Sequence, residues 1–147
     1  RTNGELACLS HFENGNLLVS PGLPILNLHI PSGGHLNPDA VDESIYQAKS
    51  FFGKLGYPNE IMLCDSWLLD PNLANILPSQ SNILSFQKRF FIMDQSEEST
   101  AVCFMFGWDL PADTDLERIA QTTLQKNCAQ YLKKHGKLHD TIGILRI

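Results

Sequence analysis

The chain has 147 residues, which is the length of a single domain that can bury its own hydrophobic core. Hydrophobic residues make up 43% of it and charged residues 18%, a composition that excludes a disordered chain. Its formal net charge is -5 with scattered Lys and Arg, so nucleic acid is not an expected partner, and no apolar run is long enough to cross a membrane.

The cysteines and the first residues bear on compartment and processing. The four cysteines lack the close, regular spacing of a disulfide framework, and no Asn-x-Ser/Thr signal occurs. The sequence begins with neither a Met nor an apolar signal segment. We therefore predict a cytoplasmic chain without disulfides that is either a processed product or a piece of a longer protein.

The first part of the chain is predicted to form three strands. The segment Glu13–Asn16 contains an Asn-Gly pair between two apolar runs, which is a strong signal for a β-hairpin. A third strand is predicted over residues 24–30. Alternation places its even-numbered apolar residues on one face and its odd-numbered residues, including His29, on the other.

A helix is predicted over residues 38–53. Asn37 is a good N-cap, Pro38 suits the first helical position, and Gly53 or Gly56 is expected to end the helix. One apolar stripe runs along it, formed by Val41, Ile45, Ala48 and Phe52.

The middle of the chain is predicted to hold a strand over residues 60–69 and a short helix that Asp70 and Pro71 begin and Pro78 ends. Residues 81–90 are expected to form a short helix that runs into a strand at "FFIMD".

The uniformly apolar run over residues 101–107 is predicted to be a buried strand. The longest helix is expected over residues 114–135, started by a capping box of Thr114 and Glu117 and followed by Gly136. A last strand is "TIGILRI". The order βββαβα(α)ββαβ predicts an α/β fold, a mixed β-sheet with flanking helices.

This order resembles the core of the GCN5-related N-acetyltransferase (GNAT) fold. Locally, "LNLHIPSGGHL", "CDSWLLDPNLANILP" and "SNILSFQKRF" resemble the C-terminal half of a family of bacterial GNAT-like acyltransferases. The resemblance covers residues 5–147. It implies one GNAT-like domain over residues 1–147, the C-terminal part of a longer protein whose N-terminal half is a partner in building the acceptor site.

The resemblance also implies a place for a co-substrate. Acyl-CoA, such as acetyl-CoA, would lie in a gap between the strand through His29 and the strand through Asp65, with its pyrophosphate near the Gly-Gly loop. The acyl group would pass directly to a small amine. The cofactor-binding residues implied in this way are Leu28, Ile30, Ser32, Gly33 and Gly34.

Three residues are candidates for catalysis. Alternation along residues 60–69 places Asp65 among apolar neighbours, so its carboxylate is expected to be buried and paired. It is a candidate general base, although a structural partner of backbone N–H groups is the favoured alternative. His29 is a second candidate base or a satisfied interface histidine. Ser66 is a candidate proton donor to the leaving thiolate.

The Gly-Gly loop has a simpler explanation as well. A tight turn needs only positive φ angles at Gly33 and Gly34. Acidic residues crowd the first turn of the following helix, where they would repel a phosphate, and the usual loop Gln/Arg-x-x-Gly-x-Gly/Ala is absent. The residues alone favour a turn.

Other chemistry is less well supported. Cys64 lies in an apolar run and is expected to pack in the core rather than to act as a nucleophile. The pairs Cys8 and His11, and His135 and His139, have tolerable zinc-ligand spacing, but no Cys-x2-Cys accompanies them, and no metal is predicted. An aromatic run is assigned to the core: Phe90, Phe91, Phe104, Phe106 and Trp108.

Two functions remain. The first is an acyltransferase that moves an acyl group from acyl-CoA to an amine acceptor by direct attack. The alternative is a non-catalytic GNAT-like binding or protein-interaction module that keeps the fold without the chemistry.

Overall fold

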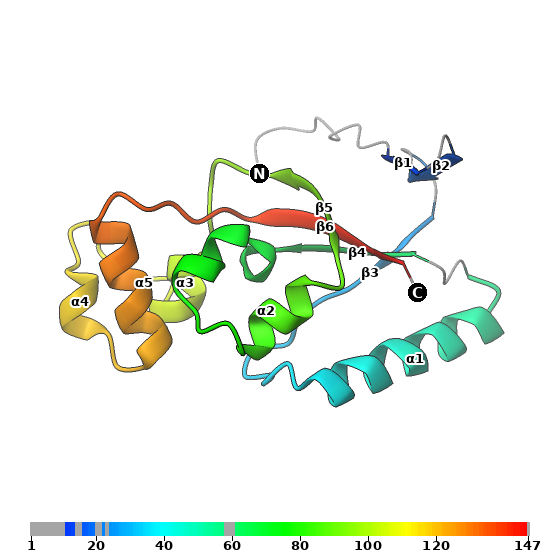
Figure 1. Ribbon diagram of the computed structural model, residues 1–147, viewed down its shortest axis with the longest axis horizontal. Helices are drawn as coiled ribbons and strands as arrows, with labels where there is room; N and C mark the ends of the chain where they lie inside the picture. The colour runs from blue at the N-terminus through cyan, green and yellow to red at the C-terminus, as the bar shows by residue number, and fades with distance from the viewer. Residues whose placement is uncertain (1–10, 14–15, 20–21, 23, 58–60, 147) are drawn as a thin grey trace.

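A four-stranded mixed sheet forms the centre of the molecule (Figure 1). Its strand order is β3 (Leu26–Asn27), β4 (Ile61–Ser66), β6 (Thr141–Arg146) and β5 (Phe91–Gln95). β3 is parallel to β4, whereas β6 is antiparallel to both β4 and β5. The computed structural model describes residues 11–13, 16–19, 22, 24–57 and 61–146.

The predicted hairpin forms a separate two-stranded sheet. β1 (His11–Glu13) pairs antiparallel with β2 (Asn16–Val19), and Glu13 is opposite Asn16. The expected Asn-Gly turn falls on residues 14–15, which lie outside the described residues. The two strands of the hairpin are confirmed.

Helix α1 (Pro38–Lys54) runs beneath the sheet in the view of Figure 1. Asn37 Oδ1 accepts hydrogen bonds from the N–H groups of Asp39 and Ala40, and Pro38 occupies the first turn. Gly56, with φ +75°, follows the helix, so the second of the two expected end residues is the correct one. The helix packs on the core through Val41, Ile45 and Ala48.

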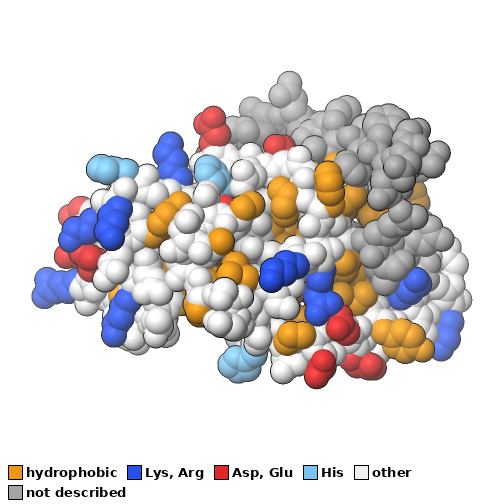
Figure 2. Space-filling model, viewed as in Figure 1, with side chains coloured by type: hydrophobic (Ala, Val, Ile, Leu, Met, Phe, Trp, Pro, Cys, Tyr) orange, Lys and Arg blue, Asp and Glu red, His pale blue; other side chains and the backbone are white. Residues whose placement is uncertain are grey.

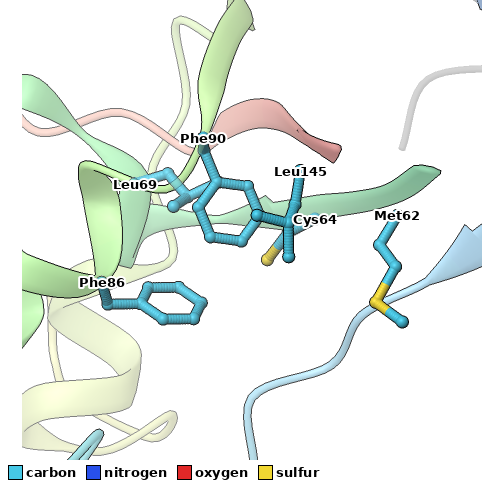
Figure 3. Close-up of a cluster of buried hydrophobic side chains, with 6 residues drawn as sticks. All are labelled: Met62, Cys64, Leu69, Phe86, Phe90 and Leu145. Carbon is cyan, nitrogen blue, oxygen red and sulfur yellow. The ribbon is translucent and has the colours of Figure 1, made fainter. Parts of the chain in front are cut away.

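The first hydrophobic cluster lies between α1 and the sheet. Figure 3 shows its buried members, which are Met62, Cys64, Leu69, Phe86, Phe90 and Leu145. The even-numbered residues of the β3 region, Leu26, Leu28 and Ile30, pack against it, whereas Asn27 and His29 are exposed. The predicted inward face is therefore confirmed, but the strand is only Leu26–Asn27 and not residues 24–30, because the chain leaves β4 after Leu28.

A second cluster packs the other end of the molecule together. Two 3₁₀ helices, η1 (Trp67–Leu69) and η2 (Pro71–Asn75), and the short helix α2 (Asn82–Gln87) follow β4. The buried residues of this cluster are Trp67, Leu73, Ile76, Ala101, Cys128 and Leu138.

The predicted strand over residues 101–107 is wrong, because this run forms helix α3 (Ala101–Phe106). Ala101 is fully buried and Met105, one turn later, packs on the same cluster, while Phe104 is exposed. The start of α3 is anchored by Asp140 Oδ1, which accepts hydrogen bonds from the N–H and the hydroxyl of Thr100 at 3.0 and 2.9 Å.

The predicted long helix is divided into α4 (Leu116–Ile119) and α5 (Thr123–Lys133). The capping box is formed by Thr122 and Gln125, not by the expected pair at the start of α4. Gln125 Oε1 accepts from the N–H groups of Gln121 and Thr122 at 2.8 and 2.9 Å. These two N–H groups therefore bond to a side chain rather than to a helix carbonyl.

Asp70 is a fully buried carboxylate between the two clusters. Its Oδ1 accepts from the N–H of Asn72 at 2.8 Å, and its Oδ2 accepts from the N–H of His139 at 2.6 Å. Its backbone carbonyl accepts from Gln87 Nε2 at 2.9 Å. One residue thus joins η2, α2 and the segment that leads into β6.

Within the described part of the chain, no helix is both long and apolar enough to cross a bilayer. On the face shown in Figure 2, Lys and Arg side chains lie over the α4–α5 end and near α1, and carboxylates lie among them.

We expect Asp70→Ala to lower the free energy of unfolding by about 2–4 kcal/mol, because two buried backbone donors lose a charged acceptor. Urea denaturation monitored by circular dichroism measures this. Asp115→Ala is the matched control, since Asp115 caps the exposed helix α4 and its loss should cost about 1 kcal/mol. Equal losses in the two variants would contradict the role assigned to Asp70.

Candidate functional site

Strands β3 and β4 run together for only a short distance. Leu26 pairs with Met62 and Asn27 with Leu63, and the N–H of Leu28 donates to the carbonyl of Leu63 at 2.7 Å. β3 ends there, whereas β4 continues to Ser66 beside β6. Figure 1 shows the chain after β3 running away from β4 towards α1.

A cavity of about 900 Å³ lies where these segments separate. The loop after β3, the end of β4, the turn before α2 and the helix α3 all contribute to its wall. Of the residues proposed from the sequence, those that line it are His29, Ile30, Ser32, Gly33, Gly34, Asp65 and Ser66. The structure thus brings together two stretches more than thirty residues apart in the sequence.

A second cavity, of about 470 Å³, lies between the loop after β3 and α1. It shares residues 29–31 with the first cavity, and Leu28, the remaining predicted site residue, lines it. Most of its wall is apolar, with contributions from Leu28, Ile30, Leu36, Val41, Ile45 and Phe86. Polar and apolar spaces of the size that ligands occupy therefore meet at His29.

Asp65 is exposed, so the prediction that its carboxylate lies on an inward face is wrong. Met62 and Cys64 are the residues of β4 that point into the core. The expected alternation counted Trp67 and Leu69 as strand residues, but both belong to η1. An exposed carboxylate beside the cavity can accept a proton without the cost of burying its charge.

His29 and Ser66 lie on the same cavity wall as Asp65. His29 is exposed rather than packed in an interface. Ser66 is half-buried, and its Oγ accepts from the N–H of Leu68 at 3.1 Å as the cap of η1. This bond uses an oxygen lone pair and leaves the hydroxyl proton of Ser66 able to be donated.

The Gly-Gly loop is a closed turn. The N–H of Gly34 donates to the carbonyl of Pro31 at 3.3 Å, and Gly33 has φ +81°. The positive φ expected of both glycines occurs only at Gly33. A Cβ at Gly34 would lie 3.4 Å from the Pro31 carbonyl oxygen, which is an ordinary contact.

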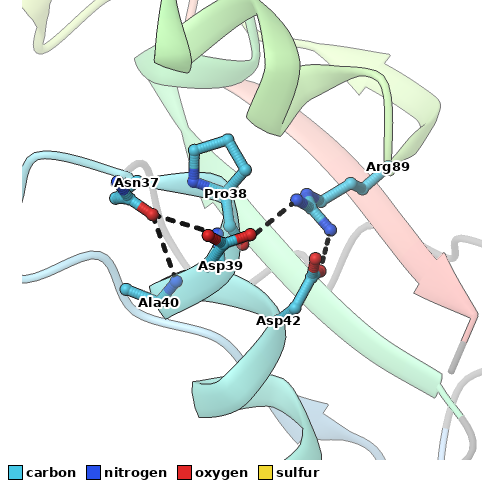
Figure 4. A network of polar contacts seen from close by, with 6 residues as sticks. All are labelled: Asn37, Pro38, Asp39, Ala40, Asp42 and Arg89. Atoms are coloured by element: carbon cyan, nitrogen blue, oxygen red, sulfur yellow. Dashed lines mark hydrogen bonds and ion pairs between the residues drawn. The ribbon is translucent and has the colours of Figure 1, made fainter.

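The backbone N–H groups at the start of α1 already have hydrogen-bond partners within the protein (Figure 4). Pro38 has no N–H, Asn37 Oδ1 accepts from the next two N–H groups, and the N–H of Val41 donates to the Asn37 carbonyl at 2.9 Å. Arg89 pairs with Asp42 and donates to the Pro38 carbonyl at 3.4 Å. A phosphate here would therefore depend on the N–H groups of the preceding loop and on the helix dipole.

Cys64 is not a nucleophile in this structure. Burial raises the pKa of its thiol to about 12, and the neighbouring charge of Asp65 adds to the shift. Burial likewise raises the pKa of Cys128 to about 11. The described residues contain no group of three or more possible metal ligands, and Cys8 lies outside them.

Two cavity residues were assigned to the core on sequence grounds and are in fact exposed. Phe104 and Trp108 line the large cavity with their rings edge to face, 5.2 Å between centroids. Residues 101–106 are all apolar, so the sequence carries no period that shows this segment to be a helix with exposed members.

Comparison with known proteins gives a family and a set of similar structures. The family of the GNAT-like C-terminal domain matches residues 5–145. An acyltransferase crystallised with decanoyl-CoA is 29% identical, with a TM-score of 0.75 over 86% of this chain and 41% of that one.

Two further structures are similar. An acyltransferase in complex with decanoyl-CoA and teicoplanin has 29% identity and a TM-score of 0.74, covering 85% of this chain and 41% of that one. A mutant acyltransferase with octanoyl-CoA has 28% identity and a TM-score of 0.75, covering 86% and 42%. This chain spans about two-fifths of the length of these proteins. No curated protein gives a significant match.

The buried thiols should resist alkylation. We expect iodoacetamide at pH 8 to leave Cys64 and Cys128 unmodified in the folded chain, because their raised pKa values keep them protonated, and to modify both in urea. Peptide mass spectrometry reads out each site. Rapid modification of Cys64 in the native chain would contradict its assignment to the core.

The two loop glycines should differ in their tolerance of alanine. We expect Gly33→Ala to lower the free energy of unfolding by about 1 kcal/mol, because a Cβ is strained at its positive φ. Gly34→Ala should change the same quantity by less than about 0.5 kcal/mol. Urea denaturation of both variants measures the difference, and the reverse order would show that the loop geometry is wrong.

Proposed function

Because this chain belongs to the family of GNAT-like C-terminal domains, we propose that residues 1–147 form the acyl-CoA-binding domain of an acyltransferase. The reaction moves the acyl group from the CoA thioester to an amine of the acceptor. The observation that carries the proposal is the cavity at the separation of β3 and β4, which is lined by residues of both segments. Similarity to acyltransferases crystallised with acyl-CoA supports it.

In this proposal the donor lies across the junction of the two cavities. Its pyrophosphate lies against Ser32, Gly33 and Gly34, and its pantetheine arm passes beside Leu28 and Ile30. Leu28 and Ile30 are half-buried and follow the point where β3 leaves β4, whereas Ser32, Gly33 and Gly34 are exposed. Loop N–H groups and the dipole of α1 favour the phosphates, although no Lys or Arg is among the described residues that line either cavity.

The transfer needs one proton acceptor and one proton donor. The amine nitrogen attacks the thioester carbonyl carbon, a C–N bond forms, and the C–S bond breaks. Asp65 or His29 takes the proton that the amine loses, directly or through water. Ser66 passes a proton to the leaving sulfur and regains one from the protonated base through water, so its hydroxyl is restored. Holding the amine against the thioester supplies much of the acceleration, because orientation replaces a bimolecular encounter.

The apolar second cavity indicates the length of the acyl chain that the donor carries. Its walls carry Leu36, Val41, Ile45 and Phe86, which suit a hydrocarbon chain better than the two-carbon acetyl group. We therefore propose a medium-chain acyl-CoA as the donor. The decanoyl and octanoyl thioesters bound by similar acyltransferases support this choice.

The acceptor site is proposed to need a further part of the protein. Similar acyltransferases are more than twice as long as the matched region, and one of them was crystallised with teicoplanin. An N-terminal half that closes over the cavity would bring the amine to Asp65 and His29.

The free buried thiols of Cys64 and Cys128 fit a reducing, cytoplasmic setting.

A second candidate function is a non-catalytic module that keeps the fold. The observation that favours it is the start of α1, where the first N–H groups are already satisfied and Arg89 is paired with Asp42. Such a module would bind a protein or a ligand without transferring an acyl group.

Binding and turnover separate the two candidates. We expect calorimetry to detect binding of octanoyl-CoA to the 147-residue chain, and Gly34→Ala to weaken it at least about tenfold by keeping a phosphate from the loop backbone. Because this variant should fold normally, a loss of affinity reports on contact and not on stability. No detectable binding at millimolar octanoyl-CoA would refute the acyl-CoA proposal.

Turnover is measured as release of the CoA thiol in the presence of an amine acceptor and the full-length protein. We expect His29→Ala and Asp65→Asn to lower the rate while leaving octanoyl-CoA affinity within about threefold, since general base catalysis contributes about 10²–10⁴-fold. Tight binding with no turnover in the unaltered protein would favour the non-catalytic module.

A further inference from the structure

Phe104 and Trp108 form an exposed aromatic pair at the outer wall of the large cavity. Phe104 is 58% exposed and Trp108 is 65% exposed, although both are among the most hydrophobic side chains in the chain. Neither belongs to the two hydrophobic clusters that hold the fold together. Exposed aromatic rings that line a cavity are typical of a binding surface.

The pair and the Gly-Gly loop line the same cavity. Both rings come from α3 and the turn after it, whereas Ser32, Gly33 and Gly34 come from the loop after β3. Asn82, the first residue of α2, fixes the loop after β3 to α2, because its Nδ2 donates to the carbonyl of His35 at 3.0 Å. The aromatic pair and the loop therefore face one continuous space in a fixed relation.

Resting on the proposed function, we propose that Phe104 and Trp108 form the subsite for the adenine ring of CoA. CoA is a linear molecule in which the pyrophosphate separates the adenosine from the pantetheine arm. If the pantetheine arm leaves the loop towards Leu28 and the apolar cavity, the adenosine leaves it on the other side. The aromatic pair offers an exposed apolar surface in the same cavity, on a different element from the loop.

The chemistry of this wall fits a nucleobase. Every nucleobase has a flat π face that can stack on an aromatic side chain, and such stacking contributes substantially to binding. Polar side chains of Gln80, Ser81 and Asn82 lie along the same cavity and can meet the edge of a base. The edge-to-face arrangement of the pair leaves ring surface available for a third ring.

The test compares a donor that has the adenosine with one that lacks it. We expect Phe104→Ala and Trp108→Ala to weaken octanoyl-CoA binding at least about tenfold and to leave the affinity for S-octanoyl-pantetheine unchanged, as measured by calorimetry. Tyr46→Ala is the matched control. Tyr46 is an exposed aromatic residue of α1 that lines neither cavity, so its loss should change neither affinity.

Fluorescence gives a second readout. The chain has two tryptophans, and Trp67 is buried, so stacking at Trp108 should quench a separable part of the emission. We expect adenosine 3′,5′-bisphosphate to quench the unaltered chain and not Trp108→Phe. Phenylalanine keeps a stacking face there, so this variant should retain most of its octanoyl-CoA affinity.

Each outcome separates this inference from the proposed function. If the unaltered chain binds neither octanoyl-CoA nor S-octanoyl-pantetheine, the proposed function fails and the subsite fails with it. If octanoyl-CoA binds and the alanine variants bind it equally well, only the adenine subsite is wrong. If both donors are weakened alike, the aromatic pair contacts the acyl arm, which also overturns the adenine assignment.

Discussion

The buried carboxylate of Asp70 connects the segments that surround the cavity. It accepts from the backbone of Asn72 and His139 and so ties the end of the β4 region to the segment before β6. Gln87 of α2 reaches the carbonyls of Leu68 and Asp70. The buried carboxylate accepts two short hydrogen bonds from backbone N–H groups. Other arrangements are less stable, because losing either hydrogen bond costs free energy. These bonds hold the segment just after β4 against α2 and the segment before β6.

The loop after β3 also stays ordered, although it leaves β4. The loop after β3 is held by its own turn between Pro31 and Gly34 and by Asn82 on the opposite wall. Arg89 holds the start of α1 through Asp42 and the Pro38 carbonyl. The walls of the cavity are therefore set before any ligand arrives, and less conformational entropy is lost on binding than with a loose loop.

Local signals predicted much of this fold. Asn37, Pro38 and Gly56 define α1 through short-range chemistry, and alternation predicted the inward face of β3 correctly. The run over residues 101–107 is apolar at almost every position and so shows no period that separates helix from strand. Only the tertiary contacts of Ala101 and Met105 decide between them.

The site was harder to predict than the fold. The cofactor-binding residues of the loop after β3 came from family resemblance, whereas Asp65 came from strand alternation; residue types alone favoured a turn and a buried carboxylate. To predict the face of the sheet on which Asp65 lies, one must know where β4 ends. β4 ends at Ser66, whose hydroxyl caps η1. Phe104 and Trp108 were missed because an apolar run does not reveal which of its members lie at the surface.

The burial of Cys64 has a consequence for the proposed binding of an acyl thioester. Cys64 is adjacent in sequence to Asp65 on the cavity wall, and an ionised thiol so close to an acyl-CoA would capture the acyl group by thioester exchange. Its sulfur points into the core and stays protonated, because burial raises its pKa. Under the proposed function, the fold would therefore hold an acyl thioester beside Cys64 without acylating that cysteine.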